Sequence, residues 1–211
     1  MTQTSLVLFQ FLSIIFGSAP ELLESTQKCG AAQWVVEPKR VASGQYGAEI
    51  SILCEVWPQQ GGDFSKLEAA LLDQAKQQGT IHSGPTAEVF EGMPSLFMDW
   101  SILRKEKNFE VESRQDVHLA NDLTQRMIVD SRSTEIKGTG YAEHAKKVNV
   151  RVQIDKTSDP LKDEVRVNVS GEFTKPWYIP EGILLSEARK RGPAEFEKGA
   201  AKIAADLAKA Y

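Results

Sequence analysis

The sequence has few of the residues that most often carry out chemistry in proteins, with 3 histidines and 2 cysteines in 211 residues. No two histidines have the spacing of a metal site, and no acidic cluster resembles an ion-binding loop. No catalytic or nucleotide-binding motif stands out. The sequence therefore predicts no metal and no cofactor, and it favours a protein that is not an enzyme.

Positive charge is not concentrated in any part of the chain. The 25 basic and 29 acidic residues give a net charge of −4. Without a basic stripe to contact phosphate groups, nucleic acid is excluded as an expected partner. Apolar residues make up 41% and charged residues 26%. These fractions exclude a disordered chain and a membrane bundle, and the length suits one domain.

The longest apolar run, Leu6–Phe16, is too short to span a bilayer comfortably and has the length of a signal-peptide core. The small residues Gly17 and Ala19 follow it. We therefore predict a signal peptide at residues 1–19 and a secreted or periplasmic protein. No basic residue precedes the run, however, and Pro20 follows it. The alternative is an uncleaved segment that packs on the domain or anchors it weakly to a membrane.

Residues 20–44 are predicted to be a linker with a short extended piece. Cys29 lies in this segment, and Cys54 lies in an alternating stripe that predicts the buried face of a strand. Cys54 would then be a small core side chain. In an oxidising compartment a disulfide between the two cysteines is an option, which the sequence leaves open.

One amphipathic helix is predicted over Phe64–Gln78, with Asp63 or Ser65 as N-cap and Gly79 as the stop. Further along the chain, alternation of apolar and polar residues predicts consecutive antiparallel strands with one buried face. The charged residues of these strands are predicted to lie on the solvated face.

Three breaks are predicted in the later part of the chain. They are a turn at His82–Pro85, an interruption of the strands at Gly138–Gly140, and a kink at Gly192–Pro193. The kink would divide the C-terminal region into two helical pieces, because proline is tolerated in the first turn of a helix. The second piece has an apolar stripe that needs a sheet to pack on.

This order of elements resembles the helix-grip fold of the START-like or Bet v 1-like (SRPBCC) superfamily. The resemblance covers Gln45–Tyr211 and rests on element order and on the proline–aromatic entry to the last helix, Lys175–Pro180. It implies a single α+β domain in which a curved antiparallel sheet of about six to seven strands packs around a long C-terminal helix. It also implies a cavity for lipids, sterols, polyketides or other apolar ligands. Members often have two helices after the first strand, whereas this sequence has one convincing helix there.

The inward stripes also favour a cavity, because small or polar residues stand beside large ones and leave room for a ligand. The alternative is that these residues interdigitate into a solid core. Ser113 and Ser131 would orient a polar group of the ligand or satisfy each other. His144 would either bind an acidic head group at the rim or lie in water. The predicted ligand-binding residues are Met98, Trp100, Ser113, Met127, Ser131, His144, Val150, Val169, Phe173, Trp177, Phe196 and Ile203.

The predicted function is that of an exported binding or carrier protein for a hydrophobic small molecule or lipid, with a peripheral membrane contact as a further option. A structural or interaction protein of the cell envelope without a ligand is one alternative. The other is a cyclase or hydrolase on the same scaffold that uses His144, Asp116 or Tyr141 as acid–base groups.

Overall fold

The computed structural model describes residues 27–106 and 109–211, so the predicted signal peptide lies outside the described residues. Among the described residues, nine strands form one antiparallel sheet with the order β1-β3-β9-β8-β7-β6-β5-β4, and β2 also pairs with β3. The strands are β1 (Gln27–Cys29), β2 (Gln33–Ala42), β3 (Gln45–Val56), β4 (Thr80–Phe90), β5 (Met93–Glu106), β6 (Phe109–Asn121), β7 (Arg126–Gly140), β8 (Ala145–Lys156) and β9 (Asp163–Thr174).

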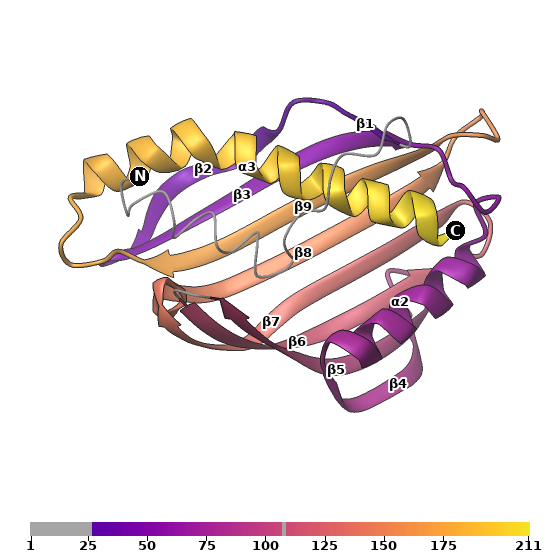
Figure 1. The fold of residues 1–211 in the computed structure, drawn as a ribbon, viewed down its shortest axis with the longest axis horizontal. Coiled ribbons are helices and arrows are strands. Elements are labelled where there is room, and N and C mark those ends of the chain that lie inside the picture. Colours follow the sequence, from indigo (N-terminus) through magenta and orange to yellow (C-terminus); the bar gives the residue numbers. More distant parts are fainter. Residues whose placement is uncertain (1–26, 107–108) are drawn as a thin grey trace.

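Two α-helices pack with this sheet in the described part of the chain: α2 (Phe64–Gln78) and α3 (Glu181–Ala210). A short 3-10 helix, η1 (Tyr141–His144), connects β7 to β8. Figure 1 shows the sheet curving around α3, with α2 beside the C-terminal end of α3. The predicted α+β helix-grip architecture is therefore confirmed. The sheet has nine strands because β1 and β2 extend it along the free edge of β3. Neither helix is long and apolar enough to cross a membrane.

The core lies between α3 and the strands β3, β9 and β8. Their apolar residues stand in register, so that Ile52 pairs with Val167 and Val167 pairs with Val152. The apolar stripe of α3 packs onto this surface through the buried side chains of Phe196 and Ala200. Because alanine is small, the helix backbone lies close to the strands and fills this part of the concave face.

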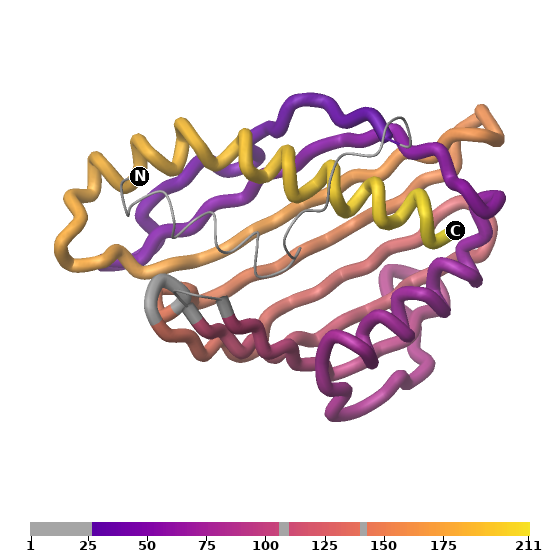
Figure 2. Tube along the Cα trace, in the orientation of Figure 1, coloured from indigo at the N-terminus to yellow at the C-terminus, as the bar shows by residue number. Residues whose placement is uncertain are grey.

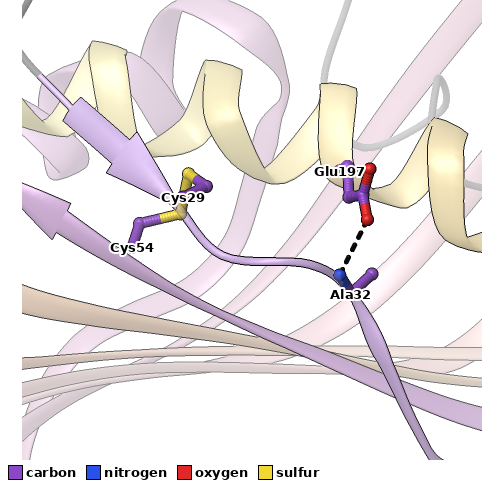
Figure 3. The surroundings of a disulfide bond; sticks show 4 residues. All are labelled: Cys29, Ala32, Cys54 and Glu197. Atoms are coloured by element: carbon purple, nitrogen blue, oxygen red, sulfur yellow. Dashed lines mark hydrogen bonds between the residues drawn. A yellow bond between two sulfur atoms is a disulfide. The ribbon is translucent and has the colours of Figure 1, made fainter.

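The edge of the sheet is joined to the core by a disulfide between Cys29 of β1 and Cys54 of β3 (Figure 3). Just beyond it, the backbone N–H of Ala32 donates to a carboxylate oxygen of Glu197 in α3 at 2.8 Å. The structure thus forms the disulfide that the sequence left open. The disulfide holds β1 on β3, and the Ala32 bond holds the segment after β1 on α3.

A buried polar cluster fixes the C-terminal end of α3, and we call it the clasp. The Tyr211 hydroxyl donates to a carboxylate oxygen of Asp163 at 2.9 Å, and the Lys156 ammonium donates to the same oxygen at 2.8 Å. The ammonium also lies 4.6 Å from the centre of the Phe64 ring at the start of α2. In addition, the backbone N–H of Gln60 donates to the Tyr211 carbonyl at 2.8 Å. The clasp therefore connects α2, α3 and the sheet.

The predicted helix Phe64–Gln78 is confirmed, and the Asp63 side chain caps it by accepting from the Ser65 N–H at 2.9 Å. The turn predicted at His82–Pro85 is wrong. These residues belong to β4, because this part of the chain runs beside β5. Ser83 pairs with Asp99, and a register shift lies on either side of Ser83.

The interruption predicted at Gly138–Gly140 is also wrong, since β6 offers a partner to each of these residues and β7 continues to Gly140. The predicted division of the C-terminal region is wrong as well. Figure 2 shows α3 as one continuous coil. Pro193 lies inside this helix. An internal proline removes one backbone hydrogen bond. Buried side chains on both sides of it, such as Ala188 and Phe196, hold the helix on the sheet.

Candidate functional site

A groove lies between α2, α3 and the sheet, because α3 covers only one side of the concave face. The closest packing of α3 is with β3, β1 and β2, and α2 packs near β4 and β6. Figure 1 shows β5, β6 and β7 beyond the cover of α3. Figure 1 shows α2 approaching α3 near the clasp, and the sheet between the two helices forms the floor of a groove.

The inner part of this groove is an apolar cavity of about 210 Å³. Side chains from α2, α3 and four strands surround it, and all of them are apolar except three glutamines and one serine. The lining residues are Leu71, Gln74, Ala75, Gln78, Met98, Trp100, Ile102, Gln115, Val117, Leu119, Val129, Ser131, Val150, Val152 and Ile203.

The outer part is a hollow of about 480 Å³ between α2 and the C-terminal half of α3. The two spaces adjoin, since both are lined by Leu71, Gln74, Gln78, Ile102 and Ile203. Charged side chains of both signs, including Lys202 and Asp206, stand at this mouth. The groove therefore has a polar entrance of mixed charge and an apolar interior.

A polar triad of Ser113, Gln115 and Ser131 interrupts the apolar floor, and the first two of these residues are buried. The Gln115 amide nitrogen donates to the Ser113 hydroxyl at 3.2 Å, and the Ser131 hydroxyl donates to the Gln115 amide oxygen. The two serines are therefore bridged by Gln115 and do not bond to each other. Trp100 contributes a wall of the cavity, and its indole N–H donates to the Ala75 carbonyl at 2.9 Å. This bond connects β5 to α2 and fixes one side of the groove.

Five of the residues predicted from the sequence come together in the groove: Met98, Trp100, Ser131, Val150 and Ile203. Gln115 and the α2 face were not predicted as parts of the site. Gln115 lies on the same face of β6 as Ser113 and Val117. This alternation could have indicated that Gln115 faces the groove. For α2, the periodicity predicts an apolar face but not the surface that it packs against.

Three predicted residues, Val169, Phe173 and Phe196, line a separate apolar void of about 50 Å³ under the N-terminal half of α3. Met127 is buried in the main core, and Ser113 is buried as part of the polar triad. These residues therefore support the shape of the concave face without lining the groove.

Two predicted residues lie outside the concave interior. Trp177 is 90% exposed in the loop before α3. His144 belongs to η1, where its Nδ1 lies 3.4 Å from the Thr174 hydroxyl and its Nε2 lies 3.3 Å from a Glu143 carboxylate oxygen. A register shift at the start of β8 ends the parity that would have placed His144 inward.

The convex face carries paired charges. The Arg151 guanidinium donates to both carboxylate oxygens of Glu91 at 2.6 Å, and this bonding lowers the pKa of Glu91. Hydrogen bonding from Arg114 likewise lowers the pKa of Asp99. These pairs fit the predicted solvated face.

The proposed acid–base groups do not meet in the groove. Asp116 projects from the face opposite to Gln115, which lines the cavity, and His144 lies at the end of the sheet. The side chain of Tyr141 lies outside the described part of the structure. Among the described residues, no group of three or more His, Cys, Asp or Glu could hold a metal ion.

No protein-family model and no curated protein sequence matches this chain. Similar solved structures include a START superfamily protein from Mycobacterium smegmatis, with 15% identity, a TM-score of 0.39, and coverage of 75% of this chain and 98% of that one. The human StarD13 lipid transfer and protein localization domain has 13% identity and a TM-score of 0.37, covering 78% and 89%. A STAR-related lipid transfer protein from Xanthomonas axonopodis has 8% identity and a TM-score of 0.41, covering 82% and 98%. At these low values, the function proposed for this chain rests on its own geometry.

Proposed function

We propose that this protein binds an apolar small molecule in the groove between α2, α3 and the sheet. The observation that carries the proposal is the inner cavity of about 210 Å³, whose mostly apolar walls stand beside a polar triad. Pockets for drug-sized ligands usually have about 300–1,000 Å³. The inner cavity therefore suits a small ligand, or the apolar end of a longer one whose other end lies in the outer hollow of about 480 Å³.

The polar triad gives this ligand an orientation. The amide nitrogen of Gln115 carries two hydrogens, and Ser113 accepts one of them. The second hydrogen can be donated to an oxygen of the ligand, such as a hydroxyl or a carbonyl. A buried polar group without a partner is costly, so the triad favours ligands that carry this oxygen over pure hydrocarbons.

The direct test is the fluorescence of N-phenyl-1-naphthylamine, which increases when this probe enters an apolar site. Ile203→Trp should fill the groove and weaken probe binding about tenfold or more, because Ile203 lines both parts of the groove. Lys198→Trp is the matched control, since Lys198 is exposed on the same helix. Equal probe binding by Ile203→Trp and Lys198→Trp would contradict the proposal.

Native mass spectrometry of gently purified protein supplies a second test. The expected result is an additional mass that organic extraction removes and that Ile203→Trp does not retain. Protein with no additional mass and no probe binding would instead favour the envelope interaction protein that the sequence left as an alternative.

We also propose that the protein is exported and that residues 1–19 are removed. The disulfide between Cys29 and Cys54 supports this proposal, because structural disulfides persist in oxidising compartments. The intact mass of the protein from its native host should correspond to a chain that begins after Ala19 and has no free thiols. A mature chain that retains Leu6–Phe16 would contradict cleavage and favour the anchored alternative.

A further inference from the structure

A cluster of exposed apolar side chains lies at one end of the molecule, far from the groove. Trp177 is 90%, Ile183 is 51% and Tyr178 is 48% exposed, and the two rings are in edge-to-face contact. We call these three residues the aromatic tip. Trp177 and Tyr178 lie in the loop between β9 and α3, and Ile183 lies in the first turn of α3. In Figure 1 this loop is at the left end, whereas the C-terminal end of α3 is at the right. With a rise of about 1.5 Å per residue, Ile183 and Ile203 are about 30 Å apart along α3.

The loop is built so that the two rings point outward. Ile179 is buried and anchors the loop, and its N–H donates to the Pro176 carbonyl at 3.1 Å. The Lys175 ammonium donates to the carbonyls of Pro176 at 3.3 Å and Ile179 at 2.7 Å. The Lys175 backbone N–H donates to Gly44 in the turn between β2 and β3 at 2.9 Å. The exposure of Trp177 therefore results from a loop that is held at both ends.

From this geometry we propose that the aromatic tip inserts into the interfacial region of a lipid bilayer. Tryptophan and tyrosine are enriched at this depth, because each has an apolar ring and a polar group that remains in contact with water. The size of the tip also favours a bilayer over a protein. A stable protein interface needs about 20–30 residues on each side, whereas a membrane anchor requires only a few apolar groups.

The charges near the tip indicate which membranes it binds. The exposed Lys146 and Lys147 lie at the same end of the sheet as Glu143 and Glu172. Since both signs are present, the attraction comes from the rings, and an uncharged bilayer surface is sufficient. Partitioning should be weak and reversible, near that of a single lipid chain at about 10⁴ M⁻¹.

The test is co-sedimentation of the full protein with phosphatidylcholine vesicles. Trp177→Ala should lower the partition coefficient about tenfold, as expected for removing one large apolar side chain. Leu161→Ala is the matched control, because Leu161 is 72% exposed in the hairpin between β8 and β9, at the opposite end of the sheet. Leu161→Ala should sediment like the unchanged protein, and high salt should not release either one.

A second measurement places the ring in the membrane. Phosphatidylcholine with brominated acyl chains should quench part of the tryptophan fluorescence of the unchanged protein, and the conservative variant Trp177→Phe should lose this quenching while still sedimenting. The proposal is overturned if the protein remains in the supernatant at all lipid concentrations, or if Trp177→Ala and Leu161→Ala behave alike. The proposal is also overturned if the unchanged protein is a dimer, Trp177→Ala is a monomer, and neither protein binds to vesicles. Trp177 does not line the groove, so Trp177→Ala should leave probe binding unchanged and a failure here does not affect the proposed function.

Discussion

The concave face of the sheet has two halves with the same alternation of apolar side chains but different covers. In the covered half, formed by β3, β9 and β8, the stripe of α3 packs against valine and isoleucine through small residues such as Ala200 and Ala204. In the open half, formed by β5, β6 and β7, α2 approaches from the side and a cavity of about 210 Å³ remains. Val150 and Val152 of β8 line this cavity at its border with the covered half. The difference shows that a cavity can arise from where a helix lies, without any unusual residue in the sheet.

The largest expected difference in the free energy of unfolding is between two variants of α3, one for each half of the concave face. Phe196 is fully buried in the core, so Phe196→Ala should lower the free energy of unfolding by about 3–5 kcal/mol. Ile203 is half-buried beside the groove, so Ile203→Ala should cost about 1 kcal/mol or less. Urea denaturation with unchanged slopes measures both values. Similar losses for the two variants would show that the open half is packed like the covered half.

The disulfide should stabilise the covered side of the sheet by an intermediate amount. It closes a loop with a sequence separation of 25 residues, which corresponds to about 3 kcal/mol in the chain-entropy description. Urea denaturation with and without dithiothreitol measures this difference. The double variant Cys29→Ala/Cys54→Ala is the control, and dithiothreitol should not change its midpoint. A midpoint of the unchanged protein that is insensitive to reduction would argue against the bond.

The smallest expected effect concerns the clasp, which joins the two helices that border the open half. Tyr211→Phe removes the hydrogen bond to buried Asp163 and should cost about 1–2 kcal/mol near neutral pH. Because α2 and α3 meet at the clasp, this variant should also weaken probe binding in the groove. Unchanged probe binding in Tyr211→Phe would mean that the groove width does not depend on the clasp.

The pH dependence of stability gives the clasp a second signature. Burial, together with the charge of Asp163, raises the pKa of the Tyr211 phenol above its ordinary value near 10. The unfolded chain therefore loses this proton at a lower pH than the folded chain. The contribution is complete below about pH 10 and falls as the pH rises further. Urea midpoints from pH 9 to 11 should decline more steeply for the unchanged protein than for Tyr211→Phe, and equal slopes would contradict this assignment.

Much of the fold could be predicted from local patterns. The alternating stripes of β5, β6 and β9 place Trp100, Gln115 and Val169 on the concave side. Gly79 ends α2 as predicted, and Asp63, one of the two predicted candidates, is its N-cap. The errors occur where a partner strand or packing overrides a local signal. Glycines at the end of β7 remain in the sheet because β6 pairs with them, and Pro193 remains in a helix because its neighbours are buried.

The candidate site was predicted less completely for the same reason. Met98, Trp100 and Ile203 were identified by parity and periodicity, which are properties of a single element. The α2 face, which supplies Leu71 and Ala75, depends on how that helix docks. The position of His144 depends on a register shift at the start of β8, which the residue types there do not predict.

The sequence by itself determined the elements, the buried face of most strands and the apolar stripe of the last helix, because side-chain direction follows the period of the backbone. Only the tertiary structure decided that α3 lies to one side of the sheet, that Cys29 meets Cys54, and that Gln115 bridges two serines at the floor of a cavity. These are contacts between residues distant along the chain. Their geometry is set by the packing of whole elements, which local patterns do not contain.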